Sequence, residues 1–407
     1  MAEIGVVLNA ALGSCPIISL ITMSSRSGPL ALIRVIEFCQ VAAGPYCGML
    51  LADMGADVIK VEPPVGDSMR TWPPLNAGYS ENFASLNRNK RSIALDLKSP
   101  ADLAIARNLI ASADVVIENN RPGVMDKLGL GYAALKGAHP KLVYCAISAF
   151  GQTGPRAQDG GFDVTVQAAS GIMSVTGDVG APPVKAGVPV SDFGAGLYAA
   201  FSIVSVLNRV ARGEAGSFID VSMLGANLGV SALQTSEYFG TGQNPKPLGS
   251  AHPRNAPYRA FQARDSYFVL AAGNNKLWAS VCDVIDRADL VKDPRFLTTT
   301  DRAKNQAELK LILETLFAAH DAPHWVAAFR AVGVPCEPIM TYADVLADPH
   351  VAQMNWVVDI ALPSGGRTKT VGPVVKMDGA GGAIYRAPPA LNGDRADIIA
   401  ELARVKK

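Results

Sequence analysis

The sequence lacks a charge imbalance. Its 37 lysines and arginines nearly balance its 36 aspartates and glutamates, which leaves a formal net charge of +1 over 407 residues. Such a chain has no overall field to attract nucleic acid or anionic lipid, so we expect neither nucleic acid nor a membrane as a partner. Any anionic ligand must be held by a local cluster of basic residues.

Cysteine and histidine are also scarce. The six cysteines have no CxxC spacing and lie among apolar neighbours, so we predict buried thiols in a reducing, cytoplasmic compartment. The five histidines include one i, i+4 pair, His320 and His324, which Pro323 interrupts and no glutamate completes as an HExxH motif. The sequence therefore predicts no metal site.

The first 28 residues have almost no charge. Residues 4–23 are uncharged and mostly apolar for about the length that spans a bilayer, but they contain Asn9, Gly13 and Pro16 and follow an acidic start. We interpret residues 1–28 as a disordered or non-native extension, with Met23 as a plausible true start. A membrane anchor is the alternative.

Apolar runs that alternate with helical segments dominate the next part of the chain. Strands are expected at 33–38, 56–62, 91–97, 114–119 and 141–148, with a Gly-Pro break at 44–45 before a short helix that ends at Gly55, and a helix over 101–113. This alternation predicts an α/β fold with a parallel, Rossmann-like sheet whose ligands bind at the carboxyl ends of the strands. The GLGYAA string at 129–134 fits GxGxxA but follows no strand directly, so we interpret it as a loop at a helix end.

The change in composition near residue 240 marks a domain linker. We expect a large Rossmann-like domain over 29–225, with a last strand within 213–224, and a linker with a smaller α+β domain over 226–345. The smaller domain should contain a hairpin through 264–266 and three helical stretches up to Val332. Residues 346–407 should return to the large domain with short strands and a polar helix from Asp394.

Two aspartates stand out by their surroundings. Asp192 ends an apolar run in GVPVSDFGAGLYAAF (187–201) and precedes a helix expected over 197–210, which predicts a partly desolvated, nucleophilic carboxylate at a strand-to-helix junction. Asp163 lies 29 residues earlier, beside Phe162, in a glycine-rich loop. Two carboxylates in one site could divide catalytic roles. For each aspartate, a helix-capping role is the alternative.

Basic residues gather at loops and helix starts of the first domain, where phosphate groups bind a Rossmann-like sheet. A solvated surface explains about half of them, but the NRNKRS cluster is expected to need an anion, since like charges repel. The set comprises Arg70, Arg88, Lys90, Arg91, Lys98, Arg121 and Lys127.

Five strings occur in an order that resembles a known family. They are QVAAGPYCGMLLADMGADVIKVEPPVGD, NRNKRSIALDL, IENNRPGVMDKLGLGY, FGQTGPRAQDGGFDVTVQAASG and VPVSDFGAGLYA. In this order they resemble the class III CoA-transferases, the family of formyl-CoA:oxalate and carnitine CoA-transferases, from about Gly28 to the C-terminus. The resemblance implies an interlocked homodimer whose subunits each have a large Rossmann-like and a small domain.

The resemblance also implies a covalent reaction. Asp192 would attack an acyl-CoA thioester, and the route would run through an aspartyl anhydride, an aspartyl-CoA thioester and a second anhydride with the acceptor acid. An acyl-CoA and a carboxylic acid would be the substrates, with no tightly bound cofactor. The implied CoA contacts are Ala42, Ala43, Leu95, Asp96, Leu97, Lys98, Asn119, Asn120, Arg121, Lys127, Gly160, Gly161 and Phe162, followed by Asp163.

The chain departs from the family pattern in three places. Pro63 stands where some members have an arginine, and the glycine-rich loop that closes over the intermediate is replaced by LGSAHPRN, with Gly249 as its only glycine. Phe162 occupies the position of the histidine that related α-methylacyl-CoA racemases need. Because phenylalanine cannot move a proton, the sequence favours a transferase over a racemase.

The part of the chain after the linker suggests the substrate. The stretch from Ser250 to Trp278 is similar to dicarboxylate CoA-transferases such as the succinyl-CoA:glutarate enzymes, with succinyl-CoA as donor. His252 and Arg254 are candidates for the second anion site, unless they are linker surface residues. A non-catalytic acyl-CoA-binding protein remains a further alternative, although it would not need Asp192.

Overall fold

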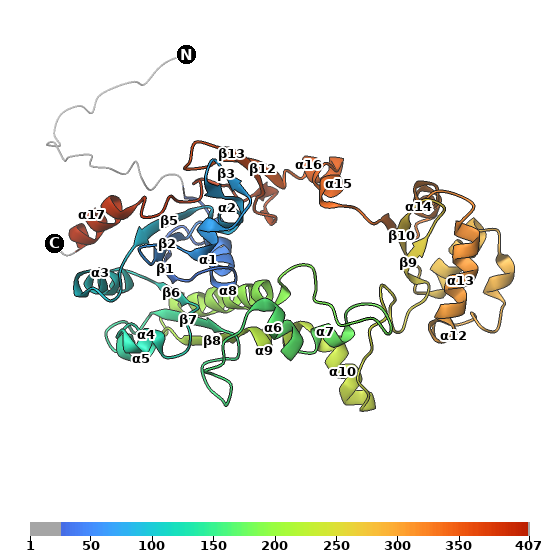
Figure 1. The fold of residues 1–407 in the computed structure, drawn as a ribbon, viewed down its shortest axis with the longest axis horizontal. Helices are drawn as coiled ribbons and strands as arrows, with labels where there is room; N and C mark the ends of the chain where they lie inside the picture. Colours follow the sequence, from blue (N-terminus) through green and yellow to red (C-terminus); the bar gives the residue numbers. More distant parts are fainter. Residues whose placement is uncertain (1–25, 406–407) are drawn as a thin grey trace, which may run out of the picture.

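The computed structural model describes residues 26–405 (Figure 1). Most of the predicted N-terminal extension, with its alternative of a membrane anchor, lies outside the described residues. At the start of the described chain, Arg26 pairs with the carboxylate of Asp57.

The centre of the molecule is a six-stranded parallel sheet, as the α/β pattern predicts. Its spatial order is β5-β2-β1-β6-β7-β8, which is the doubly wound order with a reversal between β1 and β6. The strands are β1 (Arg34–Phe38), β2 (Asp57–Glu62), β5 (Lys90–Ala94), β6 (Val115–Glu118), β7 (Val143–Ser148) and β8 (Phe218–Ser222). Helices cover both faces, so the inner strands are continuous apolar runs.

Apolar side chains pack on both faces of this sheet and form the first hydrophobic core. Val35 and Cys47 pack with the buried side of α8 (Val190–Ala211) on one face, whereas Ile36 packs with Leu109 and Ile398 on the other. The remaining elements of this part are α1 (Ala43–Asp53), η1 (Ser68–Thr71), β3 (Leu75–Asn76), β4 (Tyr79–Ser80), α2 (Glu81–Asn87), α3 (Pro100–Ala111), α4 (Val124–Lys127), α5 (Tyr132–Leu135), α6 (Asp163–Ala169), α7 (Ile172–Val175), α9 (Met223–Val230) and α10 (Ala232–Thr241).

The predicted Gly-Pro break before the first helix is wrong. Helix α1 begins at Ala43, so Gly44 and Pro45 are its second and third residues. Proline is tolerated there because the first amide groups of a helix have no partner within the helix. The glycine is required for a different reason: a Cβ at Gly44 would lie 2.3 Å from the Cys39 sulfur.

Helix α8, which contains Asp192, is longer than predicted. It spans Val190–Ala211 instead of 197–210, and residues 187–189 form no strand. Of the described helices, α8 alone is long and apolar enough to cross a membrane by length and composition. Five of its residues are buried in the protein, namely Ser191, Ala195, Gly196, Ala199 and Ile203.

A second hydrophobic core forms from a continuous stretch of chain, residues 256–336. Its antiparallel sheet contains the predicted hairpin, β9 (Tyr258–Gln262) and β10 (Tyr267–Ala271), and is completed by β11 (Cys336–Pro338). Four α-helices and a 3-10 helix occur where three helical stretches were predicted: α11 (Asn275–Val284), η2 (Ala288–Val291), α12 (Thr299–Lys304), α13 (Gln306–Phe317) and α14 (Ala322–Ala331). Phe268, Phe317 and Phe329 pack together at its centre.

The chain enters this second core after α10 and leaves it towards α15, so two extended connections join it to the sheet (Figure 1). The returning chain forms α15 (Tyr342–Leu346), α16 (Pro349–Gln353), β12 (Val357–Ala361), β13 (Arg367–Val371), β14 (Lys376–Met377), β15 (Ala380–Gly381) and α17 (Arg395–Val405). Helix α17 lies beside the outer strand β5, where Ile398 and Leu402 join the core of the sheet.

Candidate active site

The reversal of strand order between β1 and β6 is where ligands bind in doubly wound sheets. Three of the predicted CoA-binding segments begin where parallel strands of this sheet end. Ala42 and Ala43 follow β1, Leu95 to Lys98 follow β5, and Asn119 to Arg121 follow β6. The topology therefore places these predicted contacts along one edge of the sheet.

Asn119 and Asn120 hold the loop after β1 in place. The Asn119 side chain accepts a hydrogen bond from the Gln40 amide at 3.0 Å and donates one to the Gln40 carbonyl at 2.8 Å. Asn120 donates to the Phe38 carbonyl at 3.3 Å, and its amide donates at 2.7 Å to Glu118, whose pKa burial raises to about 7. Asn119 thus uses both side-chain polar atoms on the loop, which leaves its backbone for a ligand.

The same loop contains a strained residue. Val41 has φ of 66°, in the left-handed region that a β-branched residue rarely adopts. Its amide donates to both oxygens of the Asp67 carboxylate at 3.2 and 3.1 Å, and Asp67 is paired at 2.9 Å with the buried ammonium of Lys60. Such strain persists only where the surroundings fix the backbone, and it concentrates at functional sites.

Asp192 is the third residue of helix α8, in its first turn. It is therefore not the N-cap, and the helix-capping alternative is wrong: the N-cap is Pro189, which has no side-chain acceptor. The side chain is partly buried, and burial followed by the charge of Asp163 raises its pKa from 3.8 to about 6. The hydrogen bonds of residues 26–405 include none to its carboxylate.

Asp163, the first residue of α6, supplies the cap that α8 lacks. One carboxylate oxygen accepts the amide of Ser191 at 2.9 Å, and the other accepts the Gln167 side chain at 2.7 Å. The capping alternative is therefore correct in part, because Asp163 caps a neighbouring helix rather than its own. Its charge is also one cause of the raised pKa of Asp192.

Helix α8 approaches the loop after β1 very closely. A Cβ at Gly196 would lie 2.8 Å from the carbonyl oxygen of Ala43, so only glycine fits at this contact. One turn earlier, the rings of Phe193 and Tyr46 lie 4.6 Å apart. The helix that contains Asp192 therefore packs directly on the predicted CoA-binding residues of α1.

The loop before Asp163 approaches the chain after β6. A Cβ at Gly160 would lie 3.2 Å from the Arg121 guanidinium, and one at Gly161 would lie 2.6 Å from the Ala149 methyl group. Phe162 is 76% exposed, so most of its surface is left uncovered in the described monomer. Arg121, Gly160 and Asp163 thus extend the same edge of the sheet.

The expectation that the NRNKRS cluster needs an external anion is wrong. Arg88 pairs with Asp53 at 2.6 Å, and Arg91 pairs with Asp57 at 2.6 Å. Lys90 is completely buried, with Glu37 2.9 Å from its ammonium. Carboxylates that are distant in sequence therefore neutralise the cluster from inside the protein.

The four other basic residues of this set differ in whether they form an ion pair. Arg70 pairs with Glu62 at 2.7 Å. By contrast, Lys98, Arg121 and Lys127 are exposed, and no ion pair of the described residues uses them. These three cations, all predicted CoA contacts, remain for phosphate groups.

The other residues predicted after β5 differ in exposure. Leu95 is buried in the core and its amide donates to the Glu62 carbonyl at 2.8 Å, whereas Asp96 is exposed and accepts the Lys98 amide at 3.0 Å. Leu97 packs partly against the same core as Leu95. This segment can therefore present backbone groups together with the Lys98 ammonium.

The predicted second anion site lies in the linker between α10 and β9. The His252 Nδ1 atom accepts the amides of Arg254 and Asn255, each at 3.1 Å, and burial lowers the pKa of its ring. The Arg254 guanidinium is already paired at 3.2 Å with Glu237. No hydrogen bond or ion pair of the described chain links His252 or Arg254 to Asp192.

Gly249 has a specific structural role in the same linker. It has φ of 60°, and its amide donates at 2.8 Å to the Gly177 carbonyl. A Cβ at this position would lie 2.5 Å from the Asp178 carboxylate. The linker is thereby attached to the segment between α7 and α8, upstream of Asp192.

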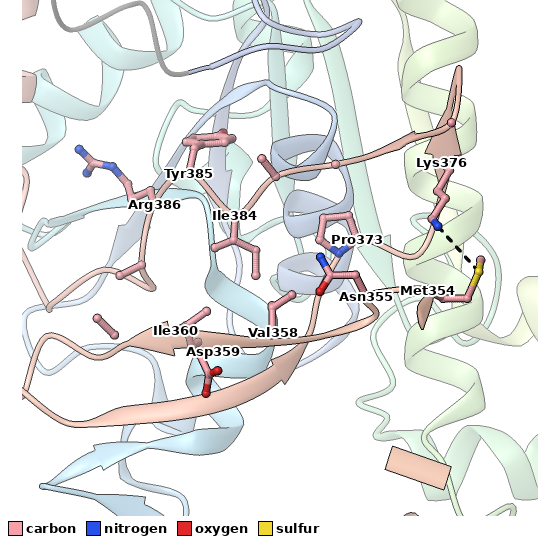
Figure 2. A pocket seen from close by; sticks show the side chains of 15 residues that line it. Met354, Asn355, Val358, Asp359, Ile360, Pro373, Lys376, Ile384, Tyr385 and Arg386 are labelled. Carbon is pink, nitrogen blue, oxygen red and sulfur yellow. Dashed lines mark hydrogen bonds between the residues drawn. The ribbon is translucent and has the colours of Figure 1, made fainter. Parts of the chain in front are cut away.

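A cavity of about 590 Å³ lies elsewhere, between β12 and the segment 373–387. Figure 2 shows Val358, Pro373 and Ile384 facing one another across it, with Lys376 turned to the sulfur of Met354. None of the predicted site residues lines this cavity. Within residues 26–405, no group of three or more His, Cys, Asp or Glu side chains could hold a metal ion.

Four buried polar residues around Asp163 were not identified from the sequence. Gln167, Ser170, Ser191 and Asn227 are each 9% exposed or less and are connected by hydrogen bonds. The available signal was an amide in an otherwise apolar helical segment, MLGANLGV, since buried asparagine requires a partner.

Comparison with known proteins assigns the chain to a family. The sequence profile described as CoA-transferase family III matches residues 30–395. A succinate–glutarate CoA-transferase of Agrobacterium fabrum is 37% identical over 95% of this chain and 98% of that protein. The human succinyl-CoA:glutarate CoA-transferase is 36% identical over 92% and 86% of the two chains. The crystal structure of a CAIB/BAIF family protein from Brucella suis superposes with a TM-score of 0.82, at 38% identity, and covers 92% of this chain and 99% of that one.

Proposed function

The chain belongs to CoA-transferase family III, and we propose that Asp192 is the nucleophile with which this CoA-transferase moves CoA from an acyl-CoA to a carboxylic acid. The observation that carries the proposal is the partly buried Asp192 carboxylate, whose pKa is raised to about 6 beside the predicted CoA-binding loop. At neutral pH this group is ionised, and it is more basic than an ordinary aspartate. Greater basicity makes it a better nucleophile.

The proposed reaction conserves all atoms without water or an oxidant. An Asp192 oxygen attacks the thioester carbonyl, the C–S bond breaks, and CoA leaves as a thiolate from a mixed anhydride. The thiolate attacks the aspartyl carbonyl, which releases the donor acid and forms an aspartyl-CoA thioester. The acceptor carboxylate then attacks this thioester, which breaks the C–S bond, releases the CoA thiolate and forms a second anhydride. The thiolate attacks the acceptor carbonyl of that anhydride, which forms the new acyl-CoA and releases the Asp192 carboxylate.

The surroundings of Asp192 support this chemistry. The N-terminal end of the α8 dipole places partial positive charge near the site of attack, where an oxyanion forms. Lys98, Arg121 and Lys127 are exposed cations at the edge of the sheet and suit the phosphates of CoA. Asp163 contributes negative charge that keeps the pKa of Asp192 high.

The test is intact-protein mass spectrometry after mixing with succinyl-CoA. The wild type should acquire a covalent CoA or acyl adduct that hydroxylamine removes, and Asp192→Ala should acquire none. An equal adduct on Asp192→Ala would refute the role of Asp192. Deuterium exchange at the α-carbon of a 2-methylacyl-CoA, without transfer, would instead identify a racemase, for which the exposed Phe162 supplies no base.

We propose succinyl-CoA as donor and a dicarboxylic acid as acceptor, because both relatives are named for succinate or succinyl-CoA and glutarate. His252 and Arg254 would bind the second carboxylate, which requires Arg254 to exchange its exposed partner Glu237 for the substrate. We expect Arg254→Ala to raise KM for glutarate more than tenfold with little change in KM for the donor. Arg264, which pairs with Asp321 on the surface, is the matched control. Equal KM values for glutarate in the two variants would refute the assignment.

We also propose that two copies form a homodimer through the exposed side of α8 to α10. This side contains Leu197, Phe201 and Phe239, of which the last is 81% exposed. Apolar side chains on this scale mark interfaces in proteins that are not membrane-bound. We expect twice the chain mass in light scattering, and a monomer for Phe201→Glu. The five described cysteines are free and buried, which suits the cytoplasmic location that we propose.

A further inference from the structure

The start of α8 is held by a hydrogen-bond network that reaches into the interior of the protein. At its centre is Asn227 of α9, which is completely buried. Its side-chain amide donates to the Ser191 hydroxyl at 2.8 Å and to the Ser170 hydroxyl at 3.0 Å. Asn227 therefore connects the residue directly before Asp192 with the residue that ends α6.

The orientation of the Asn227 amide follows from its partners. Each serine hydroxyl has a single hydrogen, and both are already used: Ser191 donates to the Asp163 carbonyl at 3.2 Å, and Ser170 donates to the Gln167 carbonyl at 3.2 Å. The two hydroxyl oxygens can therefore only accept. An amide group presents two donor hydrogens in one plane, and an apolar or acidic side chain presents none.

The network also fixes Asp163. The Gln167 side-chain amide donates to one of its carboxylate oxygens at 2.7 Å, while the Gln167 Oε1 atom accepts the Ala186 amide at 2.8 Å. The other carboxylate oxygen receives the Ser191 amide at 2.9 Å. Ser191 is thus bound at its backbone by Asp163 and at its side chain by Asn227, which leaves the next residue, Asp192, little freedom.

We propose that Asn227 is a positioning residue, which holds the first turn of α8 so that the Asp192 carboxylate meets the thioester carbonyl at the correct distance and angle. This inference rests on the proposed function of Asp192. Asn227 does not touch the reacting atoms and acts through the Ser191 hydroxyl. A nucleophile displaced by about 1 Å can lose about a hundredfold in rate, whereas substrate binding by other loops is retained.

The test compares Asn227→Leu with the wild type by quench-flow and intact-mass detection of the covalent adduct formed from succinyl-CoA. Leucine has the same number of side-chain heavy atoms with the same branching and favours the helix, but it is bulkier and donates no hydrogen bond. We expect adduct formation to slow about 10- to 100-fold, while KM for succinyl-CoA changes less than twofold. Asn305→Leu is the control, because Asn305, a partly buried residue between α12 and α13, also donates two hydrogen bonds, to the carbonyls of Arg295 and Asp301.

A second variant tests the contact itself. Ser191→Ala removes only the hydroxyl group, and it tests the proposal even where Asn227→Leu does not fold. If both residues act through one contact, Ser191→Ala should slow adduct formation at least fivefold. The rate of the double variant should then lie within about twofold of the rate of the slower single variant. Multiplied effects in the double variant would overturn the proposal.

The outcomes separate this inference from the proposed function. A wild type that forms no adduct, or an adduct that survives Asp192→Ala, overturns both. Adduct formation at the wild-type rate in Asn227→Leu, with the adduct still absent from Asp192→Ala, overturns only the role of Asn227. An equal loss of rate in Asn305→Leu would also overturn it, because general destabilisation would then explain the effect.

Discussion

Replacing Asp192 by asparagine should stabilise the protein while it abolishes the reaction. Asparagine keeps the shape of the side chain and removes its charge. The folded-state pKa of Asp192 is about 6, compared with 3.8 for an unperturbed aspartate, so the ionised form disfavours folding. A difference of about two pKa units means that the ionised carboxylate lowers the free energy of unfolding by about 3 kcal/mol at neutral pH.

The sign of the effect sets its pH dependence. Because the folded protein binds a proton more tightly at Asp192 than the unfolded chain does, this group lowers the free energy of unfolding as pH rises from about 4 to above 6. The destabilisation by ionised Asp192 is absent below pH 4, reaches about half of its full value at pH 5 and is complete by pH 8. The free energy of unfolding of Asp192→Asn should therefore exceed that of the wild type by about 3 kcal/mol at pH 8 and by about half of that at pH 5.

Urea unfolding of both proteins at pH 5 and pH 8 would measure these differences, with thermal unfolding as a second readout. Asp344→Asn is the control of opposite sign. Hydrogen bonds from Thr341 lower the pKa of Asp344, so its loss should destabilise the protein. Equal stability of wild type and Asp192→Asn at pH 8, or the same difference at both pH values, would refute the raised pKa.

Three further predictions concern the residues around this site. Asp163→Asn should move the pH midpoint of adduct formation below about 6, since the Asp163 charge helps to raise the pKa of Asp192; an unchanged midpoint in the pH–rate profile would contradict this. Lys90→Met should destabilise the fold by about 3–5 kcal/mol in urea, because the buried Glu37 carboxylate loses a partner; a tenfold weaker affinity for CoA with unchanged stability would instead support a phosphate contact. Val41→Gly should stabilise the protein by about 1 kcal/mol by relieving its left-handed backbone, and should raise KM for the acyl-CoA by loosening the loop; calorimetry and steady-state kinetics would measure the two effects, and a lower KM would refute the second.

The parallel sheet could be predicted from sequence because its strands are local signals. Continuous apolar runs such as VVIE in β6 identify strands that are covered on both faces. Once the strands are known, the carboxyl edge follows from topology, which is why the segments after β1, β5 and β6 could be named together. The extent of α1 was missed because a proline near a helix start resembles a break.

The partners of the charged residues could not be predicted in the same way. Arg91 pairs with Asp57 and with Glu401, which lies 310 residues further along the chain. Asp163 caps a helix that starts 27 residues later, and Asn227 reaches Ser191 over 36 residues. Sequence spacing carries no information on such contacts, since they depend on how the elements pack.

The order of the two cores along the chain has a consequence for synthesis on the ribosome. The core of residues 256–336 is continuous, so it can pack as soon as its last strand, β11, has left the exit tunnel. The sheet begins to form much earlier, but its outer strand β5 waits for α17, whose Ile398 and Leu402 lie far later in the chain. Until α17 is synthesised, the nascent chain therefore exposes an apolar surface beside β5, to which a chaperone can bind.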